Sequence, residues 1–369
     1  MEKRDLRIDF FRGIALLMIF TDHVPKSVGW LVTLRSWSFA DAAELFFFVS
    51  GFIAATVYLP VMRDRGFVAA LVRIWRRAWD VYAAQMVLFV FVVAEISLAV
   101  ALTHRAGYYD YFRVQGFMMQ TDAAIWRAIT LAFQPAYLDI LPVYVIFFFA
   151  LPFVLAALRR APLAVLCASL ALYLAAQLWD FTPRTWPLNQ GWFFNPFAWQ
   201  FLFVLGASFA LPDVRALFPR ADSKWVWRIA LAIVVPTVAM EITTTLHDFW
   251  PMIPALSSTG LPVTKASLEW LRIVSFLATA VLALRIVPQG QVLNRYWLGR
   301  AIIRCGQHSL PVFCLGVVLA VAAHVVWNEE RSMWLQFACT VAGLAFTLAF
   351  AALHGWIKTA ERPRALAAA

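Results

Sequence analysis

The sequence has few charged residues, which make up 14% of its 369 positions, whereas hydrophobic residues make up 63%. Soluble globular domains carry about 25% charged residues, so this composition excludes an ordinary soluble protein. No stretch resembles a separate soluble domain, a P-loop or a dinucleotide motif. We therefore expect residues 1–369 to form a single integral-membrane domain that is all-α and polytopic.

Cysteine and glycine are also scarce. The four cysteines, Cys167, Cys305, Cys314 and Cys339, form no CxxC pair and lie in or near apolar runs. This pattern suggests neither a metal site nor a disulfide framework, and we expect no metal and no cofactor. With 15 glycines and no convincing internal repeat, the chain also differs from transporters that are built from broken, repeated helices.

Apolar runs of about 17 to 25 residues predict the membrane spans. Lysine and arginine recur in alternate loops, and because such residues mark cytoplasmic loops, both termini are expected in the cytoplasm. Longer external segments are expected near residues 104–136, 180–195 and 247–268. The predicted spans, ten in all, are residues 10–32, 43–62, 78–103, 138–158, 162–179, 196–212, 226–246, 269–287, 308–328 and 332–357.

The net charge of +10 needs no nucleic-acid partner. The basic residues are dispersed over the cytoplasmic loops, where anionic lipid headgroups favour them, and they form no single basic patch. We therefore expect membrane lipid as a partner and no nucleic acid. The sequence is compatible with a monomer and with a homo-oligomer.

The first apolar run, IDFFRGIALLMIFTDHV at residues 8–24, contains Arg12, Asp22 and His23. An ionisable side chain within a bilayer costs at least about 2.5 to 3.5 kcal/mol, and such groups usually face a bundle interior or a water-filled path. Arg12 and His23 project from one helical face, roughly 16 Å apart along the axis. This favours a catalytic role for His23, with Arg12 as a distant cationic anchor. The alternative is that Arg12 only reaches the lipid headgroups and His23 only caps the end of the helix.

Four stretches carry a family resemblance. The Arg12-x10-His23 spacing resembles the signature of the family 3 membrane acyltransferases. More particularly, the chain resembles the OpgC branch, the succinyltransferases of osmoregulated periplasmic glucans. The stretches are DLRIDFFRGIALLMIFTDHVP from Asp5, QPAYLDILPVYV from Gln134, FFNPFAWQFLFVLGA from Phe193 and GQHSLPVFCLG from Gly306.

The resemblance implies an O-acyltransferase of the bacterial inner membrane, with succinyl-CoA as the expected co-substrate and a periplasmic glucan as the acceptor. His23 would act as general base, Asp22 or another acid would orient its imidazole, and Arg12 would hold or polarise the donor. An acyl-histidine intermediate is the alternative route. Glu44 would enter from the same side as His23, although a role in capping its helix is equally compatible with the sequence.

Further residues are predicted to bind the donor. Arg73, Arg76 and Arg77 share a helical face, and Arg73 and Arg76 match an Arg-x-x-Arg pair attributed to the donor in the family. Anchoring at the cytoplasmic surface is the competing interpretation. His308 is also predicted to bind the donor, although simple packing beside a Ser309 cap is the alternative. Ser50, in a family-like FFFVSGF run, is predicted to bind substrate, and Ser50 and Gly51 are expected to permit close helix contact.

Asp139, Asn195 and Gln200 are predicted to bind the acceptor. Asp139 follows the external segment near residues 104–136, and the two amides enter a helix beside aromatic residues. Amides that enter an apolar helix need partners, and hydroxyl groups of a sugar would supply them. Two alternatives stay open: an acetyl or other acyl group transferred to another envelope glycan, and a glucan exporter or flippase.

Overall fold

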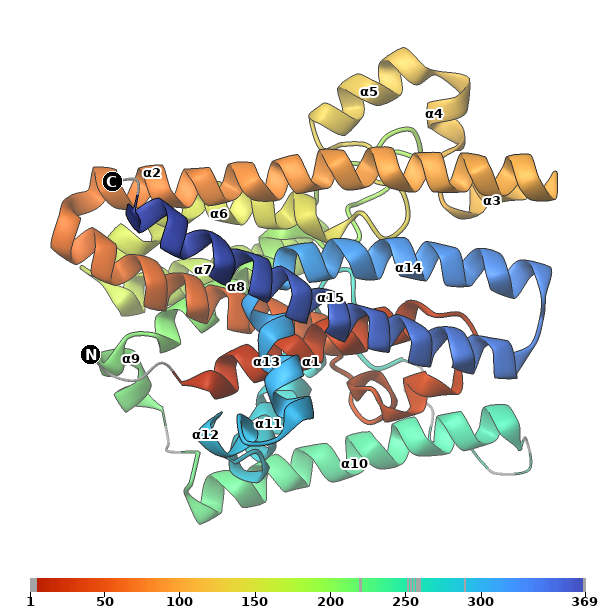
Figure 1. The fold of residues 1–369 in the computed structure, drawn as a ribbon. Coiled ribbons are helices and arrows are strands. Elements are labelled where there is room, and N and C mark those ends of the chain that lie inside the picture. The colour runs from red at the N-terminus through yellow and green to blue at the C-terminus, as the bar shows by residue number, and fades with distance from the viewer. Residues whose placement is uncertain are drawn as a thin grey trace. The chain divides into compact units, whose positions relative to one another are not determined.

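The computed structural model is helical, and it describes residues 5–218, 221–250, 252, 254, 256, 260–288 and 290–367. Within these residues only isolated β-bridges occur, and no strand forms. The helices are α1 (Leu6–His23), α2 (Ala42–Thr103), α3 (Gly107–Tyr111), α4 (Gln115–Met119), α5 (Thr121–Ile129), α6 (Ile140–Leu158), α7 (Pro162–Trp179), α8 (Pro196–Phe209), α9 (Pro212–Leu217), α10 (Lys224–Phe249), α11 (Trp270–Ile286), α12 (Gly290–Leu293), α13 (Trp297–Gln307), α14 (Ser309–Glu329) and α15 (Met333–Ala367), with 3-10 helices η1 (Val28–Val32) and η2 (Leu34–Ser36) (Figure 1).

Six described helices are long and apolar enough to cross a membrane: α2, α6, α7, α10, α14 and α15. The chain is therefore a membrane protein. The apolar helix α8 is shorter, and α1 carries four charged residues, Arg7, Asp9, Arg12 and Asp22. The number of ten spans and the cytoplasmic side of both termini stay predictions. Part of the expected external segment 247–268 lies outside the described residues.

Two predicted boundaries were wrong. The first span was expected to run to residue 32, but α1 ends at His23 and Val24 is extended. The cause is Pro25, which disfavours helical geometry at the residue before it. Two separate spans were expected at residues 43–62 and 78–103, yet α2 covers both and the stretch between them, including the helical face expected for Arg73, Arg76 and Arg77. Helical geometry is lost there only at Gly66, whose φ of 86° suits glycine, and the ribbon bends at this point (Figure 1).

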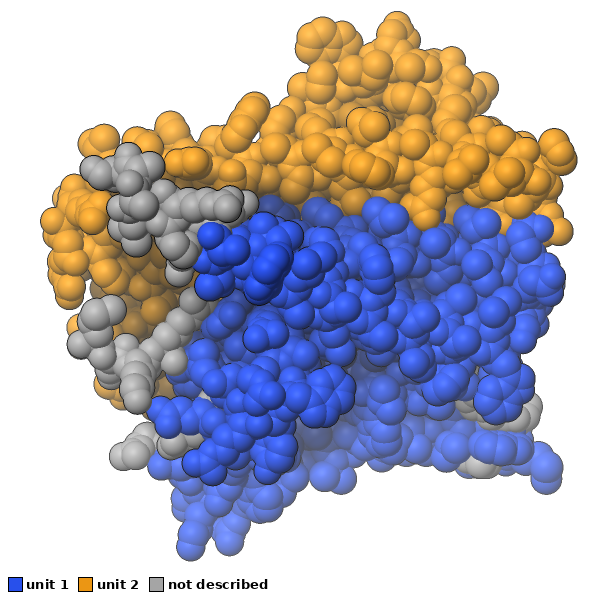
Figure 2. All heavy atoms as spheres, in the orientation of Figure 1, with its two compact units in different colours: residues 1–46, 221–258, 274–369 blue, residues 47–220, 259–273 orange. Residues whose placement is uncertain are grey.

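The chain divides into two compact units (Figure 2). Unit 1 comprises Met1–Phe46, Ala221–Ser258 and Val274–Ala369, and unit 2 comprises Phe47–Arg220 and Thr259–Ile273. Each unit thus combines segments that are distant in the sequence. The units are described separately below.

In unit 1, α1 packs against α13 through glycine on both helices. A Cβ atom at Gly13 would lie 2.0 Å from the carbonyl oxygen of Ile302, and one at Gly306 would lie 1.9 Å from that of Asp9. These separations leave no room for a side chain, so the two backbones touch. Further along α1, the Phe20 ring occupies the space beside Gly343 of α15.

Unit 2 contains a similar glycine-mediated contact, between the backbones of α2 and α8. A Cβ atom at Gly51 would lie 1.9 Å from the carbonyl oxygen of Phe203, and one at Gly206 would lie 2.0 Å from that of Phe48. The expectation that Gly51 permits close helix contact is thereby confirmed. Beside this crossing, the fully buried Phe47 packs against other aromatic rings, with centroids 4.7 Å away for Trp199 and 4.8 Å for Tyr144.

The glycine contacts predict a measurable asymmetry between two glycines of unit 1. Gly306→Ala should lower stability by about 1 to 3 kcal/mol because the new methyl group overlaps the Asp9 carbonyl. Gly316→Ala is the matched control, since its Cβ atom would lie 3.8 Å from Phe20, which is an ordinary contact. Alanine also favours a helix. Thermal unfolding of both variants in detergent tests this, and equal midpoints would contradict the proposed backbone contact.

Candidate functional site

His23 is the last residue of α1 and is half-buried. Its Nδ1 atom lies 2.5 Å from the carbonyl oxygen of Ile19, one helical turn earlier. A carbonyl oxygen can only accept a hydrogen bond, so Nδ1 carries the hydrogen and donates it. In the neutral ring, Nε2 therefore holds the lone pair, and this nitrogen can take up a proton.

Asp22 is directed toward the 3-10 helices that follow α1. Its Oδ1 atom accepts a hydrogen bond of 2.5 Å from the hydroxyl of Thr33, which also donates to the Trp30 carbonyl at 2.7 Å. This hydrogen bond joins the end of α1 to the segment of the 3-10 helices that follow it. Thr33 was missed at the sequence level, because only the fold brings it beside α1.

Arg12 lies on the same helical face as His23, as the spacing predicted. Its guanidinium carbon is 5.8 Å from the centroid of the Phe46 ring within unit 1. This is a cation–π arrangement. The half-buried guanidinium thus lies beside an aromatic face. The face of α1 carries a cation and a potential base about three turns apart.

Glu44 is fully buried in the first turn of α2. Its Oε2 atom accepts a hydrogen bond of 2.8 Å from the backbone N–H of Asp41, while Asp41 Oδ1 accepts one of 2.7 Å from the N–H of Ala43. This reciprocal arrangement is a capping box. The capping role that the sequence offered for Glu44 is thereby confirmed, and its catalytic role stays a prediction.

His308 also belongs to unit 1, at the start of α14. Its ring is half-buried and lies 5.0 Å from the ring of His354, in an edge-on arrangement. Burial, together with the charges of His354 and Lys358, lowers the pKa of His308. A neutral imidazole is favoured at this position.

The donor-site arginines lie in unit 2, on the second half of α2. Arg73 and Arg76 are exposed, whereas the half-buried Arg77 forms an ion pair of 3.9 Å with Asp80. Arg73 and Arg77 both act electrostatically on Tyr58, which precedes the bend at Gly66. The cations therefore gather where the two halves of α2 meet.

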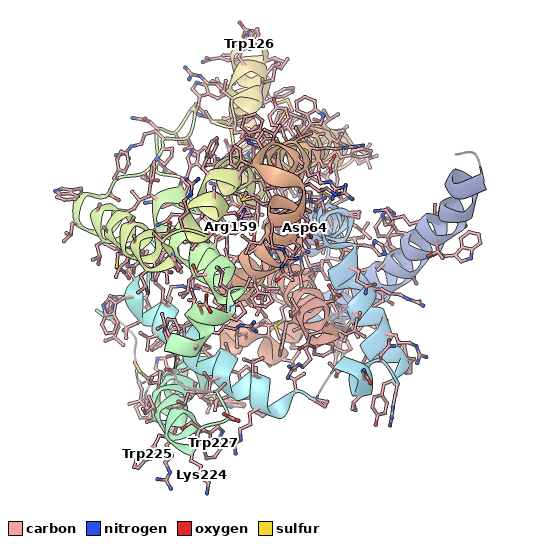
Figure 3. All side chains as sticks on the ribbon, turned by 90° about the vertical axis from the view of Figure 1, so that its left-hand side faces the viewer. Asp64, Trp126, Arg159, Lys224, Trp225 and Trp227 are labelled. Atoms are coloured by element: carbon pink, nitrogen blue, oxygen red, sulfur yellow. The ribbon has the colours of Figure 1, made fainter. Side chains whose placement is uncertain are left out.

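The bend in α2 carries further basic residues. Arg63 pairs with Asp64 at 2.8 Å, and Arg159, at the end of α6, donates to the Met62 carbonyl at 3.3 Å. Figure 3 labels Asp64 and Arg159 at this end of unit 2. Ser50 lies elsewhere on α2, where it is buried and its hydroxyl accepts a hydrogen bond of 3.3 Å from Tyr144.

The side-chain amides of Asn195 and Gln200 form hydrogen bonds with other residues of the chain. Asn195 caps α8 by accepting from the N–H of Phe197 at 3.0 Å, and it donates to the Phe181 carbonyl at 2.9 Å. Gln200 exchanges hydrogen bonds with Ser169, accepting at 2.6 Å and donating at 2.8 Å. These bonds join α7, α8 and the segment between them, so both amides have structural roles.

Asp139 lies at the start of α6 and is half-buried. Burial raises the pKa of its carboxyl, although the nearby cations Arg113 and Lys265 act in the opposite direction. Neither cation was predicted as a site residue. In the sequence they are two basic residues of external loops among several, and only the fold shows that both approach one carboxylate.

Among the described residues, no group of three or more histidine, cysteine or acidic residues could hold a metal ion, and the four cysteines are free. Unit 1 holds His23, Asp22, Arg12, Glu44 and His308, and unit 2 holds the remaining predicted residues.

Comparison with known proteins gives one family. A family model described as OpgC protein matches residues 4–359, which is nearly the whole chain. No curated protein and no solved structure matches. The matched range includes α1 with its Arg12 and His23 as well as the family-like stretches around Asp139, Asn195 and His308. The chain therefore belongs to the OpgC protein family, and this membership implies an acyltransferase.

Proposed function

We propose that this protein transfers succinyl groups from succinyl-CoA to glucose hydroxyls of periplasmic glucans, at the bacterial inner membrane. Membership of the OpgC family supports acyl transfer to a glucan. The observation that carries the assignment of the base is the hydrogen bond between His23 Nδ1 and the Ile19 carbonyl, which leaves Nε2 as the basic nitrogen.

In the proposed reaction, Nε2 of His23 removes the proton from a sugar hydroxyl as its oxygen attacks the thioester carbonyl. The tetrahedral intermediate then collapses, the carbon–sulfur bond breaks, and the imidazolium returns its proton to the departing thiolate of coenzyme A. The products are a succinyl ester of the glucan and free coenzyme A. In the alternative route, the same lone pair attacks the thioester, the carbon–sulfur bond breaks, and the departure of coenzyme A leaves an acyl-histidine. A sugar hydroxyl then attacks the acyl group, gives up its proton and releases the histidine.

Different cations are proposed to bind different parts of the donor. Arg12 would hold or polarise the donor, because it shares a helical face with His23. Arg73 and Arg76 would bind the phosphates, because both are exposed and neither forms an ion pair with any residue that the structure describes. Arg77, which pairs with Asp80, would add to the local positive potential. A cytoplasmic entry for the donor follows from the predicted side of these arginines.

Asp139 is the strongest candidate for a contact with the acceptor, since a half-buried carboxylate can accept hydrogen bonds from sugar hydroxyls. Asn195 and Gln200 would support this site by holding the ends of α7 and α8 in position. Asp22 would orient the end of α1, and Glu44, Ser50 and His308 are proposed as supporting residues.

His23→Gln should reduce succinyl transfer by about 100- to 10,000-fold, the usual contribution of a general base. The measurement is the succinate content of periplasmic glucans in a strain that lacks the endogenous enzyme and carries either variant. His104→Asn is the matched control, because His104 is exposed and has a φ of 56°. Asparagine tolerates this left-handed conformation. Equal membrane expression of all variants is verified first.

Full succinylation by His23→Gln would remove His23 from the mechanism. Failure of the wild-type chain to add succinate would instead reject the proposed acceptor or acyl group. Mass spectrometry of acid-quenched enzyme separates the two chemical routes, since only the covalent route leaves a succinyl group on the peptide that contains His23.

The proposed phosphate contacts predict a change in donor recognition. Arg73→Ala combined with Arg76→Ala should raise the KM for succinyl-CoA at least about tenfold with little change in kcat, because charged hydrogen bonds to phosphate are lost. Arg63→Ala is the control, since Arg63 already pairs with Asp64.

A second substrate sharpens this test. Succinyl-dephospho-CoA lacks the ribose phosphate, so the wild-type enzyme should discriminate against it and the double variant should discriminate less. An unchanged KM and unchanged discrimination would assign these arginines to membrane anchoring alone.

A further inference from the structure

The proposed base lies at the point where α1 ends, so the helix does not fix the chain on both sides of it. His23 is the last residue of α1, and Pro25 prevents the helix from continuing. Lys26 then adopts a left-handed conformation with a φ of 52°, which is uncommon for residues other than glycine. Such a conformation persists only where the surrounding structure enforces it. The position of His23 therefore depends on how the segment after it is held.

Ser27 joins this segment to α15. Its side chain is fully buried, and its hydroxyl oxygen lies 2.6 Å from Oγ1 of Thr340, which is 313 positions later in the sequence. Thr340 donates its own hydrogen to the carbonyl oxygen of Gln336 at 2.8 Å, one turn earlier in α15. A hydroxyl carries only one hydrogen, so Ser27 is the donor in its bond with Thr340. Ser27 Oγ in turn accepts a hydrogen bond of 3.1 Å from the N–H of Gly29 and caps η1.

The packing around Gly29 brings the same segment against α1. A Cβ atom at Gly29 would lie 3.0 Å from Cγ2 of Thr21 and 3.0 Å from Cγ2 of Thr340, which is closer than an ordinary van der Waals contact. Glycine therefore allows the chain to lie close to both helices, and α15 packs against α1 and η1. Thr21 belongs to the last turn of α1, so this packing reaches the turn that carries the proposed base.

The segment also returns to α1 further along the chain. The hydroxyl of Thr33 donates a hydrogen bond of 2.5 Å to Asp22, the residue directly before His23. Residues 24–33 thus leave α1 at His23, are joined to α15 by Ser27, and are joined to α1 again at Asp22. All these residues belong to unit 1, so the arrangement requires no relation between the two units.

We propose that Thr340 is a positioning residue for His23. By accepting the hydrogen bond from Ser27, Thr340 fixes the segment that follows the base and so keeps Nε2 of His23 directed at the reacting hydroxyl. This inference rests on the proposed succinyl transfer and deepens it. Thr340 acts through Ser27 and not on the substrates, so it affects the rate of turnover and not the binding of the donor.

The helix α15 itself contains a matched control for Thr340. Thr347 lies seven residues later on nearly the same helical face, is also buried, and donates to the Gly343 carbonyl at 2.8 Å, as Thr340 does to that of Gln336. Within the described residues, only Thr340 of these two threonines also bonds to another side chain. A comparison of valine at the two positions therefore separates the bond with Ser27 from the loss of a buried threonine hydroxyl.

The test measures kcat and KM of purified protein in detergent, with succinyl-CoA and a neutral glucan. Thr340→Val should lower kcat by about 10- to 100-fold, because small displacements of a catalytic group have effects of this size. The KM for succinyl-CoA should change little. Thr347→Val should keep kcat near the wild-type value, and Thr340→Ser, which retains the hydroxyl, should restore most of the activity.

A double variant shows whether Thr340 acts through Ser27. Ser27→Ala and Thr340→Val remove the same hydrogen bond, so their combination should lower kcat little more than the stronger single change does. Effects that multiply in the double variant would contradict the proposed coupling.

Chemical modification of His23 provides a readout apart from catalysis. Diethyl pyrocarbonate reacts with neutral imidazole, and mass spectrometry of the peptides compares its rate at His23 with that at the exposed His104. Thr340→Val should raise this ratio several-fold because the segment after His23 is released. Thr347→Val and Thr340→Ser should leave the ratio unchanged.

Equal kcat values for Thr340→Val and Thr347→Val would overturn the inference, whether both variants are active or both are inactive. A lower kcat in Thr340→Val without a change in the reactivity of His23 would also overturn it, because Thr340 would then act elsewhere. Wild-type protein that transfers no succinyl group, yet shows the dependence of His23 reactivity on Thr340, would reject the proposed reaction and retain the positioning contact.

Discussion

The organising constraint in each unit is a helix crossing in which two backbones touch. Gly13 and Gly306 make this possible in unit 1, and Gly51 and Gly206 make it possible in unit 2, since each glycine lies against the main chain of the opposite helix. Between helices in a bilayer the hydrophobic effect gives little drive for association, so close van der Waals packing has to supply it. A side chain at any of these four positions would separate the helices.

These crossings position the helices that carry the predicted site residues. The contact with α13 holds α1, the helix that carries Arg12 and His23, and the contact with α2 holds α8, which begins at the Asn195 cap. From α8, Trp199 reaches the irregular segment that carries Lys265. The proposed base and the segment that carries Lys265 therefore each depend on one glycine pair in their own unit.

The sequence predicted the helical class and most helix ends well, because apolar length and caps are local signals: residues 162–179 form α7 as expected. Its failures have local causes too, since Pro25 ended the first helix early and helical geometry is lost only at Gly66 between the two spans that were expected to be separate. The electrostatic influence of Arg113 and Lys265 on Asp139 could not be predicted, because it depends on tertiary contacts that one sequence does not show.

The hydrogen bond between His23 and Ile19 has a consequence for the route of the proton. His23 donates this hydrogen bond from Nδ1 to the Ile19 carbonyl, so in the proposed reaction a proton taken up at Nε2 would have to leave from Nε2 as well. The sugar hydroxyl and the departing sulfur would therefore have to approach the same ring nitrogen in turn.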